Sequence, residues 1–271
     1  MTHPSKVIRF CVAGITGQMG REVVRTLPQW KGLELVSGVA SKAGGLKLQD
    51  ILGQASPDLI IGGDLRDELR NKKFDVLVDL TRPEVAVSHA LWAIEKGVSP
   101  IIGTSGLEAG DLEVIEKACE SKKVPAWVIP NFSVGAVLGM RFAQLAAQWI
   151  ADVEIIEMHH EKKLDAPSGT ALETARLIQK SRLKVPTVPE TKVMKAQGAR
   201  GAQVHEVPIH SVRLSGFLAQ QMIIFGAPGE TLEIKHSVID RSTYMGGVEL
   251  SIRKVRALAG LTIGLESVLF Q

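Results

Sequence analysis

The first half of the chain alternates between short apolar runs and amphipathic stretches. Apolar, β-branched runs predict buried strands, and stretches with helical periodicity lie between them. The strands are predicted at 6–14, 33–41, 74–81 and, more weakly, 58–65, and the helices at 17–27 and 83–97. Regular alternation of this kind indicates right-handed βαβ units and a parallel sheet, so we expect an α/β first domain.

The pattern changes after Asn131. A long apolar helix is predicted first, then a strand of alternating character, a second helix, three strands resembling an antiparallel meander, and a last helix. These elements are expected at 134–151, 152–160, 169–181, 203–214, 219–227, 230–240 and 246–260. We therefore expect an α+β second domain, with the last helix packing on the first domain.

Charge and composition exclude several classes of protein. The net charge of +3 is spread along the chain, which argues against nucleic-acid binding and suits an anionic small molecule. No uncharged apolar stretch reaches about 18 residues, so we expect no membrane span. The two separated cysteines give no zinc spacing and fit a reducing cytosol. The N-terminal residues leave no room for a targeting peptide, and we expect a cytoplasmic protein.

The first strand-to-helix turn, "GITGQMG", holds glycines at 14, 17 and 20. Glycines let the backbone approach a pyrophosphate, and the N-terminus of the following helix offers N–H groups to it. The spacing differs from the usual G-x-G-x-x-G, and a glycine-rich turn without a ligand is the alternative. Its place after the first strand favours a Rossmann-like dinucleotide site.

The end of the second strand bears on the choice of cofactor. Many NAD sites place an acid there for the ribose hydroxyl, whereas this chain has Ser41 and Lys42. A hydroxyl and an ammonium favour the 2′-phosphate of NADPH, unless Lys42 is only a solvated loop residue. Two later strand ends, 103–106 and 129–133, can contact the cofactor or simply form turns. Arg82 is similarly open: it lies near phosphates or only precedes a helix.

The densest polar segment is "HHEKKLDAPSGTA", residues 159–171. His159 and His160 are expected on opposite faces of a strand, and no neighbouring set completes a metal spacing, so we predict no metal site. Thr170 and Glu173 have the spacing of a capping box, and a helix N-terminus there would bind a carboxylate or only be capped. Histidine is a side-chain type that can serve as a general acid near neutral pH, so His159 is a candidate for this role. A solvated loop remains the alternative for Glu161 and Lys162.

These motifs together resemble the dihydrodipicolinate reductase family. The match covers essentially the whole chain, and its most specific part is "EMHHEKKLDAPSGTA", with "GITGQMG", "VDLTRPE", "GTSG" and "NFSVG" in the family's order. The resemblance implies that NADPH or NADH gives a hydride to C4 of a cyclic dicarboxylate, with loss of the 4-hydroxyl as water, in lysine and diaminopimelate biosynthesis. It also implies a dinucleotide-binding domain, 1–133 with 241–271, and a substrate domain with a mixed sheet, 134–240, that builds a homotetramer.

The resemblance assigns roles to individual residues. His159 would be the proton donor and acceptor and Lys163 a second proton donor, while the substrate carboxylates would be held by His160, Ser168, Gly169 and Thr170. The cofactor would contact Gly14, Ile15, Thr16, Gly17, Gln18, Met19, Gly103, Thr104, Ser105, Ile129, Pro130, Asn131 and Phe132, in addition to Ser41 and Lys42.

The chain departs from the family pattern in places. Ser41 replaces a frequent acid, which favours NADPH over NADH. Glutamines 220 and 221 stand where a Glu-His pair is expected, and Arg241 to Tyr244 resembles a final R-x-x-F near the substrate. Two other functions are alternatives. A semialdehyde dehydrogenase needs a thiolate, for which Cys11 and Cys119 are poor candidates, and a dinucleotide-sensing regulator would not need the His–Lys segment.

Overall fold

The computed structural model describes residues 7–184, 186 and 193–270. The chain divides into two compact units. Unit 1 contains residues 1–133 and 241–271, and unit 2 contains residues 134–240. None of the helices in the described part of the chain has the length and apolarity to cross a membrane.

Unit 1 is built on a six-stranded parallel sheet, which confirms the predicted α/β architecture. The strand order is β11-β5-β4-β3-β1-β2. The strands are β1 Ile8–Ala13, β2 Leu33–Val39, β3 Val76–Asp79, β4 Ser99–Ile102, β5 Ala126–Val128 and β11 Leu261–Ile263. All four residues of β3 are buried. Both faces of the sheet are therefore covered there, which explains why this run is apolar without alternation.

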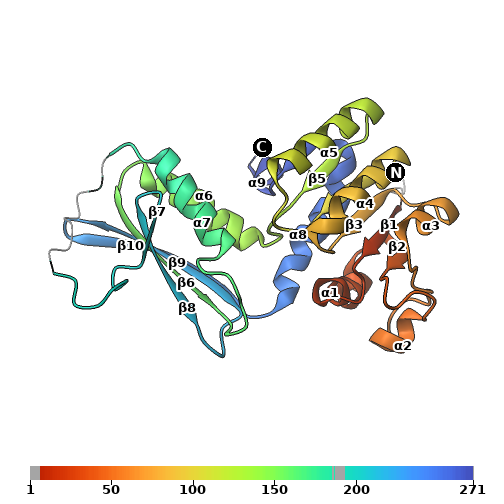
Figure 1. The fold of residues 1–271 in the computed structure, drawn as a ribbon, viewed down its shortest axis with the longest axis horizontal. Helices are drawn as coiled ribbons and strands as arrows, with labels where there is room; N and C mark the ends of the chain where they lie inside the picture. Colours follow the sequence, from red (N-terminus) through yellow and green to blue (C-terminus); the bar gives the residue numbers. More distant parts are fainter. Residues whose placement is uncertain (1–6, 185, 187–192, 271) are drawn as a thin grey trace, which may run out of the picture. The chain divides into compact units, whose positions relative to one another are not determined.

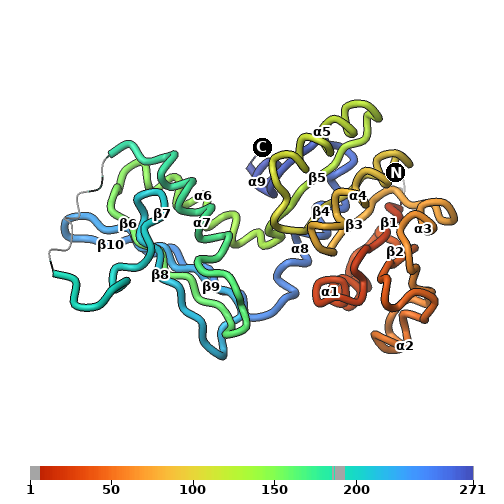
Figure 2. The backbone as a smooth tube through the Cα atoms, viewed as in Figure 1, coloured from red at the N-terminus to blue at the C-terminus, as the bar shows by residue number. Residues whose placement is uncertain are grey.

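Most helices of unit 1 lie between these strands along the chain, and the last helix follows β11 (Figure 1). They are α1 Gln18–Thr26, α2 Leu48–Leu52, α3 Leu65–Asn71, α4 Pro83–Glu95, α5 Ala109–Lys122, α8 Met245–Lys254 and α9 Glu266–Leu269, with 3₁₀ turns η1 Leu27–Gln29, η2 Arg241–Tyr244 and η3 Val255–Ala257. The last 31 residues close the unit: α8 packs against α1 and β1, and Figure 2 shows this blue segment among the red and yellow elements.

Two predictions for unit 1 were wrong. Residues 58–65 form no strand but make only the isolated bridges Val39↔Gly62 and Lys47↔Ile60. The predicted final helix ends at Lys254, and a short strand, β11, follows and pairs with β5. Three residues carry too little periodicity to be recognised, because this strand is defined by its partner rather than by its own pattern.

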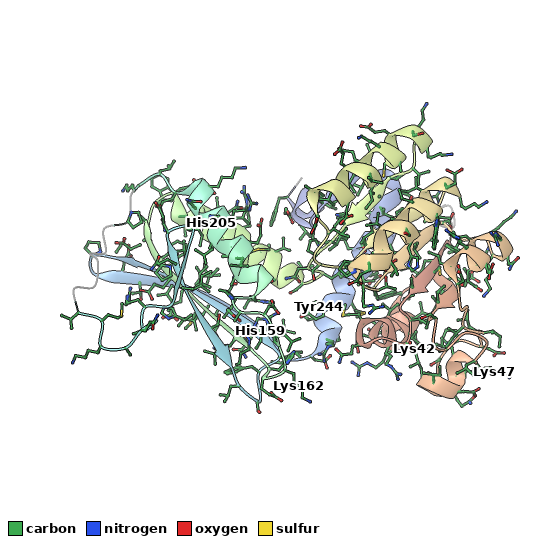
Figure 3. All side chains as sticks on the ribbon, in the orientation of Figure 1. Lys42, Lys47, His159, Lys162, His205 and Tyr244 are labelled. Carbon is green, nitrogen blue, oxygen red and sulfur yellow. The ribbon has the colours of Figure 1, made fainter. Side chains whose placement is uncertain are left out.

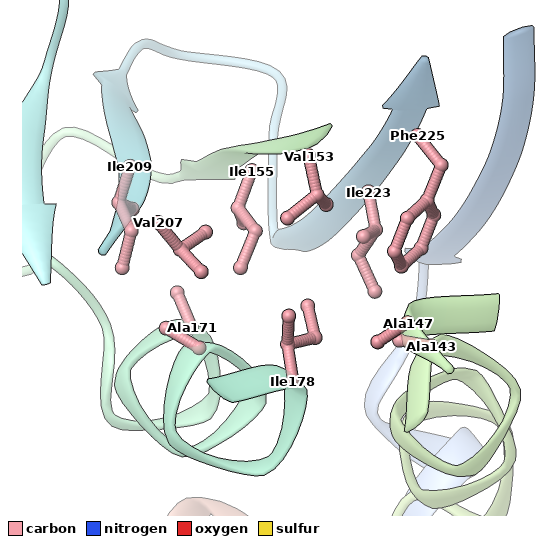
Figure 4. Packing of buried hydrophobic residues seen from close by; sticks show 11 residues of the cluster. Ala143, Ala147, Val153, Ile155, Ala171, Ile178, Val207, Ile209, Ile223 and Phe225 are labelled. Atoms are coloured by element: carbon pink, nitrogen blue, oxygen red, sulfur yellow. The ribbon is translucent and has the colours of Figure 1, made fainter. Parts of the chain in front are cut away.

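Unit 2 combines a five-stranded mixed sheet with two helices on one face. Its elements are α6 Val134–Ala147, β6 Asp152–His159, α7 Gly169–Ser181, β7 Ala202–Val204, β8 Val207–Arg213, β9 Ala219–Ala227 and β10 Glu230–Val238. Alternate strand residues face α6 and α7, as Figure 4 shows. This core consists of Ala143, Ala147, Val153, Ile155, Ala171, Ala175, Ile178, Val207, Ile209, Ile223 and Phe225.

The expected meander was only partly right. The strand order is β10-β9-β6-β8-β7, so β6 lies between β9 and β8, antiparallel to the first and parallel to the second. Residues 203–214 form a hairpin of two strands, β7 and β8, rather than one strand. Hairpins follow from local turns, whereas the insertion of β6 between distant strands depends on long-range pairing. The result is that β6, which ends at His159, is the central strand.

Candidate active site

The glycine loop of unit 1 lies between β1 and α1. Gly14 has a φ of +80°, and a Cβ on it would lie 2.9 Å from the Leu80 carbonyl oxygen. Helix α1 begins after Gly17, which makes no side-chain cap, and its first turn holds no acidic residue. The N–H groups and positive dipole end of α1 therefore suit a pyrophosphate, which fits the dinucleotide that the sequence predicts.

Gly20 brings α1 against this loop. A Cβ on Gly20 would lie 2.6 Å from the Ile15 Cα and closer still to the Gly14 oxygen. These neighbours are backbone atoms, which cannot move as a flexible side chain does. The third glycine of the motif therefore serves helix packing rather than contact with a ligand.

The loops after β3 and β4 are joined beside Gly14. Asp79, fully buried at the end of β3, accepts hydrogen bonds from the Thr81 N–H at 2.9 Å and from the Thr81 hydroxyl. Its second oxygen lies 2.7 Å from the His89 Nδ1 atom. The Thr104 hydroxyl donates to the Thr81 carbonyl at 2.8 Å. Asp79 and His89 were not singled out from the sequence, although an aspartate that ends an apolar strand is a signal.

The loop after β5 reaches the same edge of the sheet. A Cβ on Gly103 would lie 2.6 Å from the Phe132 ring, so the strand ends of β4 and β5 are packed together. Ile129 and Phe132 are buried, while Pro130 is exposed. The structure thus gathers the predicted cofactor residues of β1, β4 and β5 at one sheet edge, where ligands bind in open α/β sheets.

The turn after β2 carries Ser41 and Lys42, both exposed. Lys42 and Lys47 come from the same loop and are labelled in Figure 3. Glu68 reaches β2 from α3, where its carboxylate accepts a hydrogen bond from the Ser37 hydroxyl and pairs with the Lys72 ammonium at 2.8 Å. That carboxylate is therefore occupied within the protein.

Arg82 precedes α4, with its side chain 83% exposed and 3.9 Å from the Glu84 carboxylate. A role of Arg82 near phosphates stays a prediction.

His159 is the last residue of β6 and is paired with a buried carboxylate. Its Nδ1 atom lies 2.5 Å from Glu157 Oε2, and its side chain is 15% exposed whereas that of Glu157 is fully buried. The Arg213 guanidinium donates to both Glu157 oxygens, at 2.9 and 2.8 Å. The Ser168 N–H donates to Glu157 Oε1 at 3.3 Å. Glu157 and Arg213 are site residues that were missed in the sequence.

These contacts set the protonation state of Glu157. Burial raises the pKa of Glu157, but the hydrogen bonds from His159, Arg213 and Ser211 outweigh it and lower this pKa from 4.5 to about 2. Glu157 is therefore an ionised carboxylate at neutral pH and can only accept hydrogen bonds.

The loop after β6 holds Lys163. Its ammonium pairs with the Asp165 carboxylate at 2.7 and 2.9 Å, and this hydrogen bond is the main cause of the lowered pKa of Asp165. The loop closes by a hydrogen bond from the Lys163 N–H to the His160 carbonyl, 3.1 Å long. Glu161 and Lys162 are exposed, which agrees with a solvated position for both. Figure 3 labels Lys162 in this loop.

Helix α7 begins two residues earlier than the predicted capping box. Ser168 is the N-cap, and its hydroxyl accepts a hydrogen bond from the Ala171 N–H at 3.3 Å. Glu173 instead pairs with Arg176 at 2.6 Å, because residues three apart on an exposed helix face lie side by side. Gly169 and Thr170 form the first turn of α7, a position that can bind a carboxylate.

The segments that depart from the family pattern lie on β9 and in η2. Gln221 is buried on β9 and donates to the Thr174 hydroxyl at 2.9 Å, and this hydroxyl donates to the Thr170 carbonyl at 2.7 Å. Gln221 thus ties the sheet to the first turn of α7. Arg241 and Tyr244 lie in η2 of unit 1. Proximity of Arg241 to the substrate stays a prediction.

Both cysteines are free and buried. Burial raises the pKa of Cys11 to about 12 and that of Cys119 to about 11. Neither supplies a thiolate near neutral pH, so covalent aldehyde chemistry has no nucleophile in them. Among the residues that the structure describes, no group of three or more His, Cys, Asp or Glu side chains is arranged to hold a metal ion.

Comparison with known proteins places both units in one family. The family descriptions "Dihydrodipicolinate reductase, N-terminus" and "Dihydrodipicolinate reductase, C-terminus" match residues 8–132 and 135–269. The 4-hydroxy-tetrahydrodipicolinate reductase of Geobacillus thermodenitrificans is 46% identical over 263 residues, which cover 97% of this chain and 99% of the relative. The enzyme of the same name from Bacillus cereus strain AH187 is 42% identical, with the same coverage of both chains.

A solved structure agrees with these relatives. The dipicolinate-bound dihydrodipicolinate reductase from Paenisporosarcina sp. TG-14 is 39% identical, with a TM-score of 0.86 over 97% of this chain and 100% of its own.

Proposed function

Because the chain belongs to the dihydrodipicolinate reductase family, we propose that it reduces 4-hydroxy-tetrahydrodipicolinate to tetrahydrodipicolinate with a nicotinamide cofactor and loss of water. This reaction is a step of lysine and diaminopimelate biosynthesis. The observation in the structure that carries the proposal is the pairing of His159 with the buried Glu157 carboxylate, next to the N-terminus of α7. A proton donor and a carboxylate-binding helix end are what a dicarboxylate reductase requires. A dinucleotide sensor without turnover would use neither.

The reaction divides between the two units. The reduced nicotinamide, when bound, supplies the hydride. Gly14 to Met19, Gly103 to Ser105 and Ile129 to Phe132 hold the cofactor in this proposal, supported by the packing of these strand ends at one sheet edge. His160, Ser168, Gly169 and Thr170 hold the substrate carboxylates, supported by their place at or near the start of α7. With Nδ1 bound to Glu157, only Nε2 of His159 can exchange a proton with the substrate.

Lys163 is the second proposed proton donor. Its ammonium is held by Asp165 in the structure, so it must leave this carboxylate before it reaches the substrate. A substrate carboxylate is a replacement partner for the same charge. In this proposal Asp165 holds the lysine ammonium in place until the substrate arrives.

The direct test follows nicotinamide absorbance with substrate formed freshly from pyruvate and aspartate semialdehyde by a coupling synthase. We expect rapid, enzyme-dependent oxidation of NADPH, and slower oxidation of NADH. Reactions without the synthase, or without this protein, give the background rates. Folded protein that binds NADPH but oxidises neither cofactor would contradict the proposed reaction and favour the sensing role.

We further propose a preference for NADPH over NADH. One support is the exposure of Ser41 and Lys42 in the turn after β2. A second is Glu68, whose carboxylate binds Ser37 and Lys72 and is therefore not free to accept the ribose hydroxyls of NADH. A Ser41→Glu substitution should lower the NADPH/NADH ratio of kcat/KM by about tenfold or more, since a carboxylate repels a 2′-phosphate and accepts ribose hydroxyls. Steady-state kinetics with both cofactors measure it.

The matched control is Ser41→Gln, which adds a side chain of similar size without charge. It should leave the ratio nearer to that of the unaltered protein. An unchanged ratio in Ser41→Glu would show that another residue reads the 2′-phosphate.

A homotetramer is proposed from the face of the unit 2 sheet opposite α6 and α7. This face presents Ile156 and Met158 of β6 beside Met222 and Ile224 of β9, all only partly buried in the single chain. An apolar patch of this kind suits a second copy, although the same sheet face also carries the charged cluster of Glu154, Arg200 and His210. Sedimentation equilibrium should give the mass of four chains, and the mass of one chain would refute the assembly.

A cytoplasmic location is proposed from the two buried free cysteines.

A further inference from the structure

We propose that Glu157 is a positioning residue that sets the tautomer and orientation of His159, and that Arg213 holds Glu157 in place for this task. The expected fall in kcat rests on the proposed reaction, whereas the expected change in the His159 tautomer does not. It names two residues that act through His159 rather than on the substrate.

The strand geometry creates the pair. Residues two apart on a strand share a face, so Glu157 and His159 both lie on the face of β6 that packs against α7, while His160 follows the end of the strand. At this position Glu157 is fully buried and His159 keeps a narrow exposed edge, 15% of its side chain. The strand therefore places a carboxylate behind the imidazole and leaves the front open.

Every acceptor position of the carboxylate is used. Oε1 accepts from Arg213 Nη2 at 2.8 Å and from the Ser168 N–H at 3.3 Å. Oε2 accepts from Arg213 Nη1 at 2.9 Å and from His159 Nδ1 at 2.5 Å. A carboxylate has about four lone-pair sites, and the Ser211 side chain also donates to Glu157, so none remains for a substrate. This is why Glu157 is a positioning residue and not a catalytic one.

The charge of Glu157 decides the tautomer. The lowered pKa of about 2 keeps the group ionised, so the proton between the two residues belongs to His159 Nδ1. Neutral His159 then presents an unprotonated Nε2, and protonated His159 presents an Nε2–H stabilised by the carboxylate behind it. Both states are needed to donate and regain a proton at the same atom.

Arg213 extends the arrangement to the lysine loop. It comes from β8, the parallel neighbour of β6, and its Nη2 also donates to the Asp165 carbonyl at 2.6 Å. Asp165 in turn binds Lys163. One guanidinium therefore anchors the carboxylate behind His159 and the backbone of the residue that holds Lys163.

The contrasting interpretation is a buried ion pair that only ties β6, β8 and α7 together. It predicts a loss of stability when the pair is broken, but no specific change in His159. The tautomer of His159 separates the two, because it depends on the acceptor at Nδ1 and not on the stability of the fold.

The test is Glu157→Gln, with steady-state kinetics and ¹⁵N NMR of the His159 ring. We expect kcat to fall about 100-fold or more, with the affinities for NADPH and for dipicolinate, used as the binding probe, within about threefold. The ring should change from the Nδ1–H form to a mixture, because an amide both donates and accepts. A kcat within about threefold of the original, or an unchanged Nδ1–H form, would overturn the proposal.

Two further variants keep the test decisive. Glu154→Gln is the matched control, since Glu154 binds His210 and Arg200 on the opposite face of the same strand, and its kcat should stay within about twofold. If the unpaired Arg213 prevents Glu157→Gln from folding, the double variant with Arg213→Gln removes both charges. It should fold and remain about 100-fold slow, and recovery of the original kcat would make the pair purely structural.

Failure of the proposed reaction is seen separately. If the unaltered protein does not turn over the substrate, the reaction assignment is wrong, yet the NMR result on His159 still decides whether Glu157 sets its tautomer.

Discussion

His159→Gln is expected to lower kcat by about 10²–10⁴-fold while KM changes by less than about threefold. The glutamine amide can still donate a hydrogen bond to the buried Glu157 carboxylate, so the fold and the carboxylate-binding end of α7 should persist. It has no proton to exchange near neutral pH. The loss therefore falls on the step in which the hydride-reduced substrate takes up a proton, and steady-state kinetics with NADPH measure it.

His160→Gln is the matched comparison for this prediction. His160 lies one residue further, outside the strand, and is proposed to hold a substrate carboxylate. Its replacement should raise KM more than it lowers kcat, because a binding contact made in the ground state is lost. Equal kcat in His159→Gln and the unaltered protein would assign proton transfer to another group, of which Lys163 is the first to examine.

Gly20→Ala is expected to destabilise the protein by about 2–3 kcal/mol, or roughly 5–10 °C in Tm, and to weaken NADPH binding more than about tenfold. The new methyl group would lie 2.6 Å from the Ile15 Cα, with the Gly14 oxygen closer still. Both neighbours are backbone of the glycine loop, so either α1 or the loop must move. The movement displaces the N–H groups that are proposed to bind the pyrophosphate.

Gly17→Ala provides the control, three residues earlier in the same motif. Its Cβ would meet only the Gly14 oxygen, at 3.1 Å, and its φ of −71° suits any residue. Thermal unfolding without cofactor should show a loss below about 1 kcal/mol, so that packing is separated from any effect on the ligand. Equal Tm values for the two variants would show that α1 is not held against the loop as the structure has it.

Local signals in the sequence predicted a large part of this protein. The alternation of apolar runs with amphipathic stretches predicted a parallel sheet, which the structure contains, and the segment from Glu157 to Ala171 predicted the family, which the comparisons confirm. The same reasoning failed where partners are distant. It missed β11 and placed a strand at 58–65, because propensity cannot show which backbone groups find partners. The capping box was placed two residues late for a local reason, since Ser168 and not Thr170 is the N-cap of α7.

The sequence by itself determined the family, and with it the residues that are proposed to carry the chemistry: the glycine loop, His159, Lys163 and the Ser-Gly-Thr helix start are recognisable from their types and their spacing along the chain. The tertiary structure decided what surrounds them. Glu157 and Arg213 are 56 residues apart, and they meet only because β6 and β8 pair in parallel at the centre of the sheet. Strand order is set by the burial of whole faces and by pairing over long separations, and so the anchoring of Glu157 by Arg213 has no local signature.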